Sequence, residues 1–483
     1  MKPAALERAI ETGRAPVLQA IRDRGTYVAE CAAMFPSVTP VCATAIATGV
    51  RQDEHHIPAM CWYDREEGRY VDYGSSFASS RRLGFSRQLK DLIYNMNGEH
   101  LPAETLTIFE QLDDLGVRTA GTTYLIYRGR HEHRPARDSP LSRLASTVIR
   151  RPVMGPRELF YADVFASRET GCSSALGLPG ARDQHTGCVG AYLVERDLCD
   201  FLLFSLPDND THSHKHGPDA QVASIAEADR QLERLALAAG GVEAFLDEWA
   251  VIAVADHSHA PVEQVIDLEG AVGARFTVLP PSGRRAEDAE VALCPSQRSA
   301  QLYALGDGAA ARAVVVPRLV ETAQAVDGVD VVCFRAGDGD AVVRRGDAEL
   351  RFAPGTSVED PRGGRWRVHG DHDALGATMH GAGFESPDYP DALARVWAAL
   401  TCPTSGDVVL SAAPGWEFPD WGGVDHVGGG SHGSLHAVDS LGALVFCGVE
   451  APAERTERGQ WSIRDIAPMA VAHFAGADGE WPG

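Results

Sequence analysis

The stretch CDFLLFSLPDNDTHSHKHGPD, residues 199–219, places an apolar run directly before a cluster of acids and histidines. Its first part, residues 199–206, is rich in Phe and Leu and predicts a β-strand covered on both faces, as in a parallel sheet. Open α/β sheets bind their ligands at the carboxyl ends of such strands. The stretch therefore predicts an α/β fold with a functional site where this strand ends.

Short apolar runs and amphipathic helices alternate along the chain, which is typical of a layered α/β fold. We expect strands at residues 121–127, 199–206, 250–255, 407–412 and 443–449. We expect helices at residues 3–12, 15–24, 219–239, 388–400 and 463–474. Residues 276–384 are instead rich in Gly, Asp, Arg and Val in alternating runs, which predicts a small inserted β-rich domain.

Acidic residues outnumber basic residues in the 483-residue chain, 67 against 44, for a net charge of −23. This balance argues against binding to nucleic-acid polymers or anionic membranes, because both require basic surface. It favours a chain that handles an anionic substrate locally, for example with metal ions. Apolar residues make up 44% of the chain, enough for a substantial core.

The sequence also bears on the environment of the protein. No stretch approaches the roughly 18 apolar residues that a membrane span needs, and residues 1–27 lack the apolar run of a signal peptide. The ten cysteines are scattered and form no C-x-x-C pair, so a disulfide scaffold is not expected. We expect a cytoplasmic chain with reduced thiols. Nothing in the sequence indicates an oligomeric state.

The segment FPSVTPVCATAIATG, residues 35–49, leads into a predicted helix through small and hydroxyl-bearing residues. A hydroxyl near a helix N-terminus can be held beside a phosphate by backbone N–H groups and the helix dipole. Taken alone, the pattern also fits an ordinary Ser/Thr helix cap.

Two acids and then three histidines occupy every second position from 208 to 216 in LPDNDTHSHKHGPD, residues 206–219. Two Asp-x-x-x-His spacings occur, Asp208 with His212 and Asp210 with His214. Because residues four apart share one face of a helix, either pair can present a carboxylate and an imidazole to one cation. A solvated polar loop is the alternative, and we favour metal-site chemistry.

A second apolar run ends in VIAVADHSHAPV, residues 251–262, where Asp256 and His257 are adjacent and His259 is close by. Neighbours in an extended strand point in opposite directions, but at a strand-end turn both can converge on a metal ion. A lone Asp-His pair is weak evidence and is often a loop feature. The fully apolar strand before it favours a site.

The fourth segment is GGVDHVGGGSHGSLHAVDS, residues 422–440. Its glycines let the backbone pass close to a site while presenting His432, with His426 and His436 as further candidates. By itself the segment is also typical of a flexible turn.

Together, these segments bring oxygen and nitrogen ligands and a hydroxyl from distant parts of the chain. The set suits two divalent cations of borderline softness, such as Zn²⁺, that would share a nucleophile and a substrate oxyanion. The sequence has no Walker A motif, no G-x-G-x-x-G after the first strand and no G-x-S-x-G where they would be needed.

In this order, the four segments resemble the alkaline phosphatase superfamily, and within it the type I phosphodiesterase/nucleotide pyrophosphatase branch, which includes phosphonoacetate hydrolase. Thr39 of FPSVTPVCATAIATGVRQDEHHI stands at the family's nucleophile position. Asp256 and His257 match the family's Asp-His pair, and His432 of GSHGS matches its last ligand. The resemblance implies a three-layer core, residues 1–275 and 385–483, with a mostly parallel central sheet, and a cap domain at residues 276–384.

Alignment on the Gly-Pro pair after the histidines selects Asp210 and His214 over the other Asp-x-x-x-His pair. By this resemblance, Asp210, His214 and His432 would hold one metal ion. The other would be held by Asp256, His257 and an Asp at the end of the family's first strand, with Thr39 beside it. The substrate-binding residues are not predicted.

That first Asp has no counterpart here. The chain begins MKPAALERAIETGRAP, which matches the helix after the family's first strand, so the Asp would fall just before Met1. One hypothesis is a misassigned start codon, which we favour because losing a central strand exposes two neighbouring edges and removes core packing. The other hypothesis is a weakened enzyme or a truncated, non-catalytic metal-binding homologue.

The resemblance implies a hydrolase of small anionic phosphoesters, with two divalent ions, expected to be Zn²⁺, and a phosphothreonine intermediate on Thr39. Where eukaryotic members place an Asn, this chain has Cys42, a poor hydrogen-bond donor, which puts nucleotide preference in doubt. Hydrolysis of a phosphonate C–P bond on the same site is the alternative.

Overall fold

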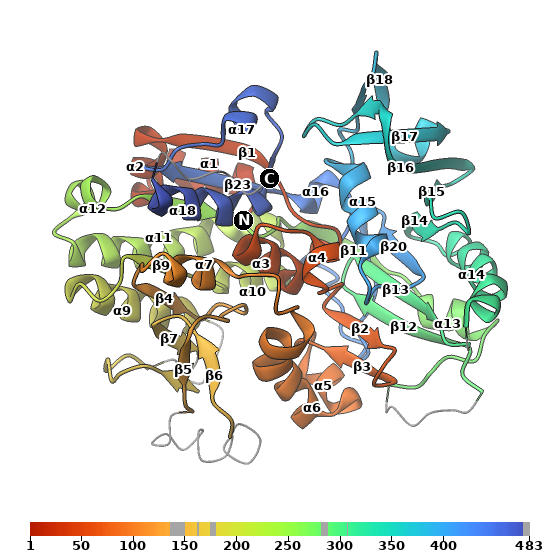
Figure 1. Ribbon diagram of the computed structural model, residues 1–483, viewed down its shortest axis with the longest axis horizontal. Coiled ribbons are helices and arrows are strands. Elements are labelled where there is room, and N and C mark those ends of the chain that lie inside the picture. Colours follow the sequence, from red (N-terminus) through yellow and green to blue (C-terminus); the bar gives the residue numbers. More distant parts are fainter. Residues whose placement is uncertain (136–149, 162–163, 174–179, 282–287, 307, 477–483) are drawn as a thin grey trace.

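The computed structural model describes residues 1–483 except 136–149, 162–163, 174–179, 282–287, 307 and 477–483 (Figure 1). The described residues form an α/β core with two four-stranded sheets, and a second unit built on a nine-stranded sheet.

The first core sheet, in the order β10-β23-β1-β24, lies between two helical layers. Ala443 and Val445 of β23 pack in one hydrophobic cluster, whereas Leu444 and Phe446 pack in another on the opposite face. The strands are β1 (Thr26–Ala32), β10 (Val251–Val254), β23 (Leu441–Cys447) and β24 (Trp461–Ser462). One layer contains α1 (Pro3–Glu11), α2 (Pro16–Arg24), α11 (Gln221–Ala238) and α12 (Val242–Glu248), and the other contains α3 (Thr39–Thr48) and α18 (Ile466–Ala475) (Figure 1).

The second core sheet, in the order β8-β7-β4-β9, is also covered by helices. Val189 of α9 packs with Ala120 of β4, and the ring of Phe109 of α7 contacts that of Phe201 of β9. The strands are β4 (Thr119–Thr122), β7 (Glu158–Tyr161), β8 (Phe165–Ala166) and β9 (Phe201–Phe204), and the helices are α7 (Ile108–Asp114) and α9 (Arg182–Glu195). The core therefore has the layered α/β architecture that the sequence predicts.

The expectation of a mostly parallel central sheet is not confirmed. Strand β4 is parallel to β7 and β9, and β1 to β24, but β23 is antiparallel to both β1 and β10, and β7 to β8. An apolar run indicates burial on both faces, which an antiparallel strand between helices also has, so strand direction did not follow from it. The strand expected at 121–127 ends at Thr122, because Thr123 has φ of 55°, outside the extended region.

The second unit holds the expected β-rich segment, but its sheet extends beyond residue 384. Strand β20, at the position expected for a core strand, lies between β13 and β14. The strands are β12 (Val291–Ser296), β13 (Ser299–Ala304), β14 (Val329–Arg335), β15 (Ala341–Arg345), β16 (Ala348–Glu359), β17 (Arg365–Gly370), β18 (Thr378–His380), β19 (Gly383–Glu385) and β20 (Val408–Ala412). Its helices include α13 (Leu268–Gly273), α14 (Gly308–Gln324) and α15 (Ala392–Thr401). The division into domains at residues 276 and 384 stays a prediction.

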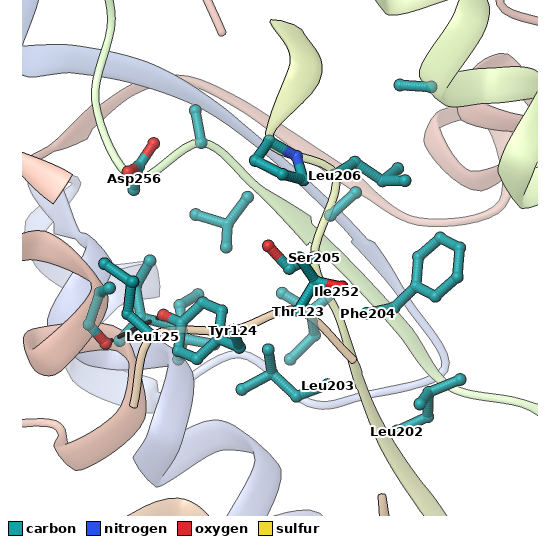
Figure 2. Close-up of a pocket in the computed structure, with 18 of the residues that line it drawn as sticks. Thr123, Tyr124, Leu125, Leu202, Leu203, Phe204, Ser205, Leu206, Ile252 and Asp256 are labelled. Atoms are coloured by element: carbon teal, nitrogen blue, oxygen red, sulfur yellow. Dashed lines mark hydrogen bonds between the residues drawn. The ribbon is translucent and has the colours of Figure 1, made fainter. Parts of the chain in front are cut away.

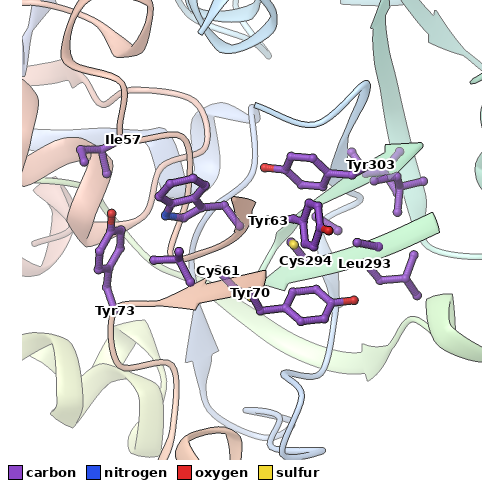
Figure 3. Packing of buried hydrophobic residues seen from close by; sticks show 14 of the residues in the cluster. Ile57, Cys61, Tyr63, Tyr70, Tyr73, Leu293, Cys294 and Tyr303 are labelled. Atoms are coloured by element: carbon purple, nitrogen blue, oxygen red, sulfur yellow. The ribbon is translucent and has the colours of Figure 1, made fainter. Parts of the chain in front are cut away.

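An aromatic cluster joins the second unit to the core. Tyr63 and Tyr70, on the hairpin of β2 (Cys61–Asp64) and β3 (Arg69–Asp72), pack with Tyr303 of β13 and Leu293 of β12 (Figure 3). The side chain of Ser296, at the end of β12, accepts a hydrogen bond from the backbone of Cys61 at 3.1 Å. This packing fixes the β12–β13 turn against the core.

The expectation of fully reduced thiols is wrong for one pair of cysteines. Cys172 and Cys188 form a disulfide, while the eight other cysteines are free and buried. The two partners lie 16 residues apart, one of them on α9, a proximity that the absence of a C-x-x-C motif does not exclude. Among the described residues, no helix is long and apolar enough to cross a membrane.

His55 gives the fold a pH-dependent stability. It ends α4 (Gln52–His55), is fully buried, and accepts a hydrogen bond from the N–H of Ile57 on Nδ1 at 3.1 Å. Burial lowers its pKa to about 3, from about 6.5 in an unfolded chain. Between these values only the unfolded chain binds the proton, so the free energy of unfolding falls as the pH falls from about 6.5 towards 3.

We therefore predict that His55→Asn, whose side-chain oxygen can replace Nδ1 as the acceptor, flattens this dependence by up to about 1.4 kcal/mol per pH unit. Urea unfolding of both proteins between pH 4 and pH 7 measures the two slopes. Identical slopes would show that His55 is protonated equally in the folded and unfolded states.

Candidate active site

Helix α10 (Asp208–His216) presents the expected carboxylate and imidazole on one face. The helix starts with acids and ends with basic residues, which suits its dipole, and Gly217 with φ of 81° followed by Pro218 ends it. Asp210 Oδ1 lies 3.5 Å from His214 Nε2, one helical turn away.

The other Asp-x-x-x-His pair does not join this cluster. Asp208 accepts from Arg182 Nε at 2.8 Å and from the N–H of Asp183 at 3.1 Å, so it ties α10 to α9. The ring of His212 lies against that of His216, at 4.7 Å between centroids. The geometry therefore distinguishes the two pairs that spacing alone left equal.

The glycine-rich loop brings His432 to the same place. His432 Nε2 lies 3.4 Å from Asp210 Oδ1, and His432 Nδ1 donates to Ser37 O at 2.8 Å. The loop passes so close to α10 that a Cβ on Gly429 would lie 2.0 Å from the carbonyl oxygen of His214. Close approach thus requires glycine there, and the carbonyl of Gly430 accepts from His214 Nδ1 at 2.8 Å.

His259 is a fourth member of the cluster that sequence reasoning did not select. Its Nε2 lies 2.9 Å from Asp210 Oδ1. His259 directly precedes β11 (Ala260–Val265). One ligand atom from each of four side chains lies within 4.8 Å of the others: Asp210, His214, His259 and His432. The sequence showed His259 beside the Asp-His pair, but no spacing rule connected it with α10.

The donor set fits a divalent metal ion. Three imidazoles and one carboxylate are ligands that Zn²⁺ accepts. His432 Nε2 is buried and has no hydrogen-bond partner among the described residues. The Nδ1 bonds of His214 and His432 to carbonyl oxygens place their N–H groups there and leave each Nε2 facing Asp210 as a lone-pair donor.

Burial sets the protonation of these groups. It lowers the pKa of His214 to about 4 and that of His259 well below its usual range. Burial raises the pKa of Asp210, but contacts with the surrounding imidazoles outweigh it and hold that pKa well below its usual range. At neutral pH Asp210 is therefore a carboxylate, and His214 and His259 are neutral imidazoles, which are the forms that bind metals.

A second group lies at the end of β10. His257 Nε2 is 3.3 Å from Asp256 Oδ2 and 3.3 Å from Thr39 Oγ1. The ring of His257 stacks on that of His432 at 3.6 Å, so the two groups are adjacent. Burial raises the pKa of Asp256 and lowers that of His257 well below its usual range.

Thr39 is the first residue of α3, a helix whose other residues are all buried. Its side chain is partly exposed, and the positive end of the helix dipole lies behind it. Ser37, two residues earlier, is fully buried, donates to the carbonyl of Ser434 and accepts from the N–H of Gly433. Of these two hydroxyls, Thr39 is the accessible one.

The other two candidate histidines, His426 and His436, contact other side chains or cap a helix. His426 stacks on His214 at 4.1 Å and its Nδ1 lies 3.1 Å from Glu417 Oε2. His436 is the N-cap of α16 (Ala437–Ser440), where it accepts from the N–H of Val438. Neither belongs to the four-residue cluster.

Gln297, in the β12–β13 turn, reaches the site from the second unit. Its backbone has φ of 60°, which is uncommon for a residue other than glycine. Its Nε2 lies 3.4 Å from His214 Nε2, and its buried Oε1 has no hydrogen-bond partner among the described residues. Sequence reasoning missed Gln297 because a single Gln in a turn carries no motif.

Solved structures with the same fold include phosphonoacetate hydrolase from Sinorhizobium meliloti 1021 in complex with phosphonoformate. It has a TM-score of 0.54 and 16% identity, and the match covers 98% of this chain and 93% of that chain. Human ectonucleotide pyrophosphatase/phosphodiesterase 5 has a TM-score of 0.54 and 11% identity, covering 97% and 92%. These likenesses show an alkaline-phosphatase-like α/β fold.

The sequence of residues 1–435 matches the model of the family described as type I phosphodiesterase/nucleotide pyrophosphatase. A search of curated protein sequences gave no significant match. Because the family match spans most of the chain, it confirms the resemblance carried by the four segments. The chain belongs to the type I phosphodiesterase/nucleotide pyrophosphatase family, whose members are hydrolases.

Proposed function

We propose that this protein is a metal-dependent phosphodiesterase that hydrolyses small anionic phosphoesters through a phosphothreonine on Thr39. The observation that carries the proposal is the position of Thr39 Oγ1. It lies at the start of a buried helix, 3.3 Å from His257 and beside an Asp/His cluster suited to a cation. The family match supports the reaction class.

The chain offers two groups of ligands. Asp210, His214 and His432 would hold one ion, with His259 as a further donor, and Asp256 and His257 would hold the other. Zn²⁺ fits the imidazole-rich donor set best. Bound divalent ions would neutralise the substrate phosphate and lower the pKa of the Thr39 hydroxyl.

The reaction forms a bond between Thr39 Oγ1 and phosphorus and breaks the bond from phosphorus to the leaving oxygen, which departs as an alcohol or a phosphate. The N-terminal turn of α3 lies behind Thr39, so its dipole favours the negative charge of the phosphoryl group. Water then breaks the bond between Oγ1 and phosphorus, which restores the hydroxyl and releases the product. Cys42 is fully buried and supplies no donor to the substrate.

Gln297 would position the substrate from the second unit. Its carboxamide Nε2 lies 3.4 Å from His214 Nε2, and its strained backbone is held by the turn between two paired strands. A carboxamide N–H there can donate to a non-reacting phosphate oxygen. This gives the β-rich unit a part in substrate binding.

Thr39→Ala should lower kcat for bis(p-nitrophenyl) phosphate by about 10³-fold or more, because the nucleophile is lost. Its zinc content should match that of the unaltered protein, and Thr39→Ser should retain part of the activity. Zinc-supplemented hydrolysis and elemental analysis measure both. If Thr39→Ala remains active while Ser37→Ala does not, the nucleophile is Ser37.

His214→Ala and His432→Ala should each weaken zinc binding by about tenfold or more, since each removes a donor from the cluster. His212→Ala is the matched control, because His212 lies on the same helix outside the cluster. Zinc titration with a competing chelator gives the affinities. Equal losses in all three variants would reject the ligand assignment.

Gln297→Glu should raise KM for the diester about tenfold, because it places a negative charge beside an anionic substrate, and Gln297→Ala should raise it less. Gln297→Ala, which adds no ligand, should leave zinc affinity unaffected. Gln264→Ala, at an exposed position of β11, controls for the loss of a glutamine. Unchanged kinetics in Gln297→Glu would remove Gln297 from the substrate site.

Phosphonate cleavage on the same site stays a prediction, since likeness of fold does not favour either substrate. Incubation with phosphonoacetate, followed by measurement of released inorganic phosphate, distinguishes phosphonate cleavage from phosphodiester hydrolysis. Zinc binding without turnover of either compound would identify a non-catalytic homologue.

A further inference from the structure

Two short helices, α5 (Phe77–Leu83) and α6 (Phe85–Lys90), lie beside the β2–β3 hairpin at the bottom of Figure 1. Their buried side chains include Ser79, Leu83 and Gln88, which hold the helices to the rest of the molecule. Six other residues of the two helices are exposed, and we call them the basic aromatic face. They are two phenylalanines and four cations: Phe77, Arg81, Arg82, Phe85, Arg87 and Lys90.

The two phenylalanine rings of this face lie at the outer surface. Phe77 is 72% exposed and Phe85 is 55% exposed, and their ring centroids are 6.4 Å apart. Other incompletely buried apolar side chains, such as Leu203, Phe204 and Ile252, line a cavity of about 930 Å³ within the core (Figure 2). Those side chains offer no outer surface to a partner, whereas the rings of the basic aromatic face do.

The glycine-rich loop adds apolar surface next to α5. Gly422 packs so closely against this helix that a Cβ on it would lie 2.5 Å from the Cβ of Ala78. Val424 and Val427, which follow in the same loop, are 39% and 50% exposed. The two exposed rings therefore lie beside further exposed apolar side chains.

The four cations of the face have no acidic partner. Among the described residues, none of them forms an ion pair or a side-chain hydrogen bond, whereas Arg118 at the surface binds a carboxylate. Asp72 and Asp91 flank the two helices, with no acid between them. Both are buried, since Asp72 accepts hydrogen bonds from the turn that follows it and Asp91 pairs with Arg69. The neighbouring loop contributes one exposed acid, Asp425, so the face is locally positive.

Local charge decides what such a face attracts. At physiological ionic strength the screening length is about 8 Å, so exposed charges farther away contribute little. The net charge of −23 therefore does not prevent this face from binding an anionic surface.

The combination of exposed rings and unpaired cations fits the surface of an anionic bilayer. Aromatic rings insert at the boundary between headgroups and acyl chains, and arginine and lysine bind lipid phosphates. A soluble polyanion would bind the cations but leave the rings in water. A second copy of this chain, docked through the same face, would place like charges opposite each other.

We propose that the basic aromatic face docks the protein on an anionic phospholipid bilayer, with Phe77 and Phe85 inserted among the headgroups and the four cations bound to lipid phosphates. Ser75, two residues before Phe77, lines the same small recess as Gln297 and His426. Docking on this face therefore brings the active site close to the bilayer. The proposal does not rest on the proposed function.

The first test measures sedimentation of the unaltered protein with two kinds of vesicle, phosphatidylcholine alone and an equal mixture of phosphatidylcholine and phosphatidylglycerol. We expect at least about tenfold tighter binding to the mixed vesicles at low ionic strength, and weaker binding at high ionic strength. No binding to the mixed vesicles, or equal binding to both kinds, would overturn the proposal. Because this comparison uses the unaltered protein, it stands even if a variant fails to fold.

The second test changes the charge of the face. Arg81→Glu/Arg82→Glu should weaken binding to the mixed vesicles by about tenfold or more, because two lipid contacts become repulsive. Arg8→Glu/Arg14→Glu is the matched control, since both residues are exposed outside the face and the change in net charge is identical. An equal loss in the control would mean that overall charge, and not this face, governs binding.

The third test removes the rings. Phe77→Ala/Phe85→Ala should weaken binding to the mixed vesicles by about tenfold, while Leu237→Ala/Val314→Ala should not. The control residues are 66% and 64% exposed and lie on other helices. Full binding by the phenylalanine variant, with equal retention on immobilised heparin, would assign the face to a soluble polyanion. A dimer in analytical ultracentrifugation that only this variant loses would assign the face to a second copy, and either result would overturn the proposal.

Discussion

The arrangement of the site depends on the carboxylate of Asp210. It lies partly buried among three imidazoles from three separate segments, and a buried charge is costly unless it is paired or binds a metal ion. Two of those imidazoles, His214 and His432, are oriented by backbone carbonyl oxygens that receive their Nδ1 protons. The backbone thereby aims each Nε2 at Asp210, so the fold fixes both the position and the tautomer of these ligands.

A buried ion pair holds the second unit to this arrangement. Arg298, in the β12–β13 turn, lies 2.8 Å from Asp439, and both side chains are fully buried. The N–H of Arg298 also donates to the carbonyl oxygen of His432 at 2.9 Å. The turn that carries Gln297 is therefore attached directly to the loop that carries His432. This connection places the β12–β13 turn of the β-rich unit directly beside the site on the core.

Much of the site could be predicted because its signals are local. The Asp-x-x-x-His spacing on α10 and the Asp-His pair after β10 each follow a strand, and the geometry brings both together with His432 and Thr39. His259 and Gln297 could not be predicted in the same way, since their proximity to His214 arises only from tertiary packing. Strand direction, the place of β20 and the Cys172–Cys188 bond likewise depend on contacts between distant residues.

We propose above all that Asp210 and its imidazoles form a metal centre next to Thr39. Crystals grown with zinc, measured on both sides of the zinc absorption edge, test this most directly. An anomalous peak should lie within bonding distance of Asp210, His214 and His432, at about 2.0–2.2 Å from the ligand atoms. A fully folded chain whose anomalous map shows no peak at these residues, at saturating zinc and neutral pH, would refute the metal centre.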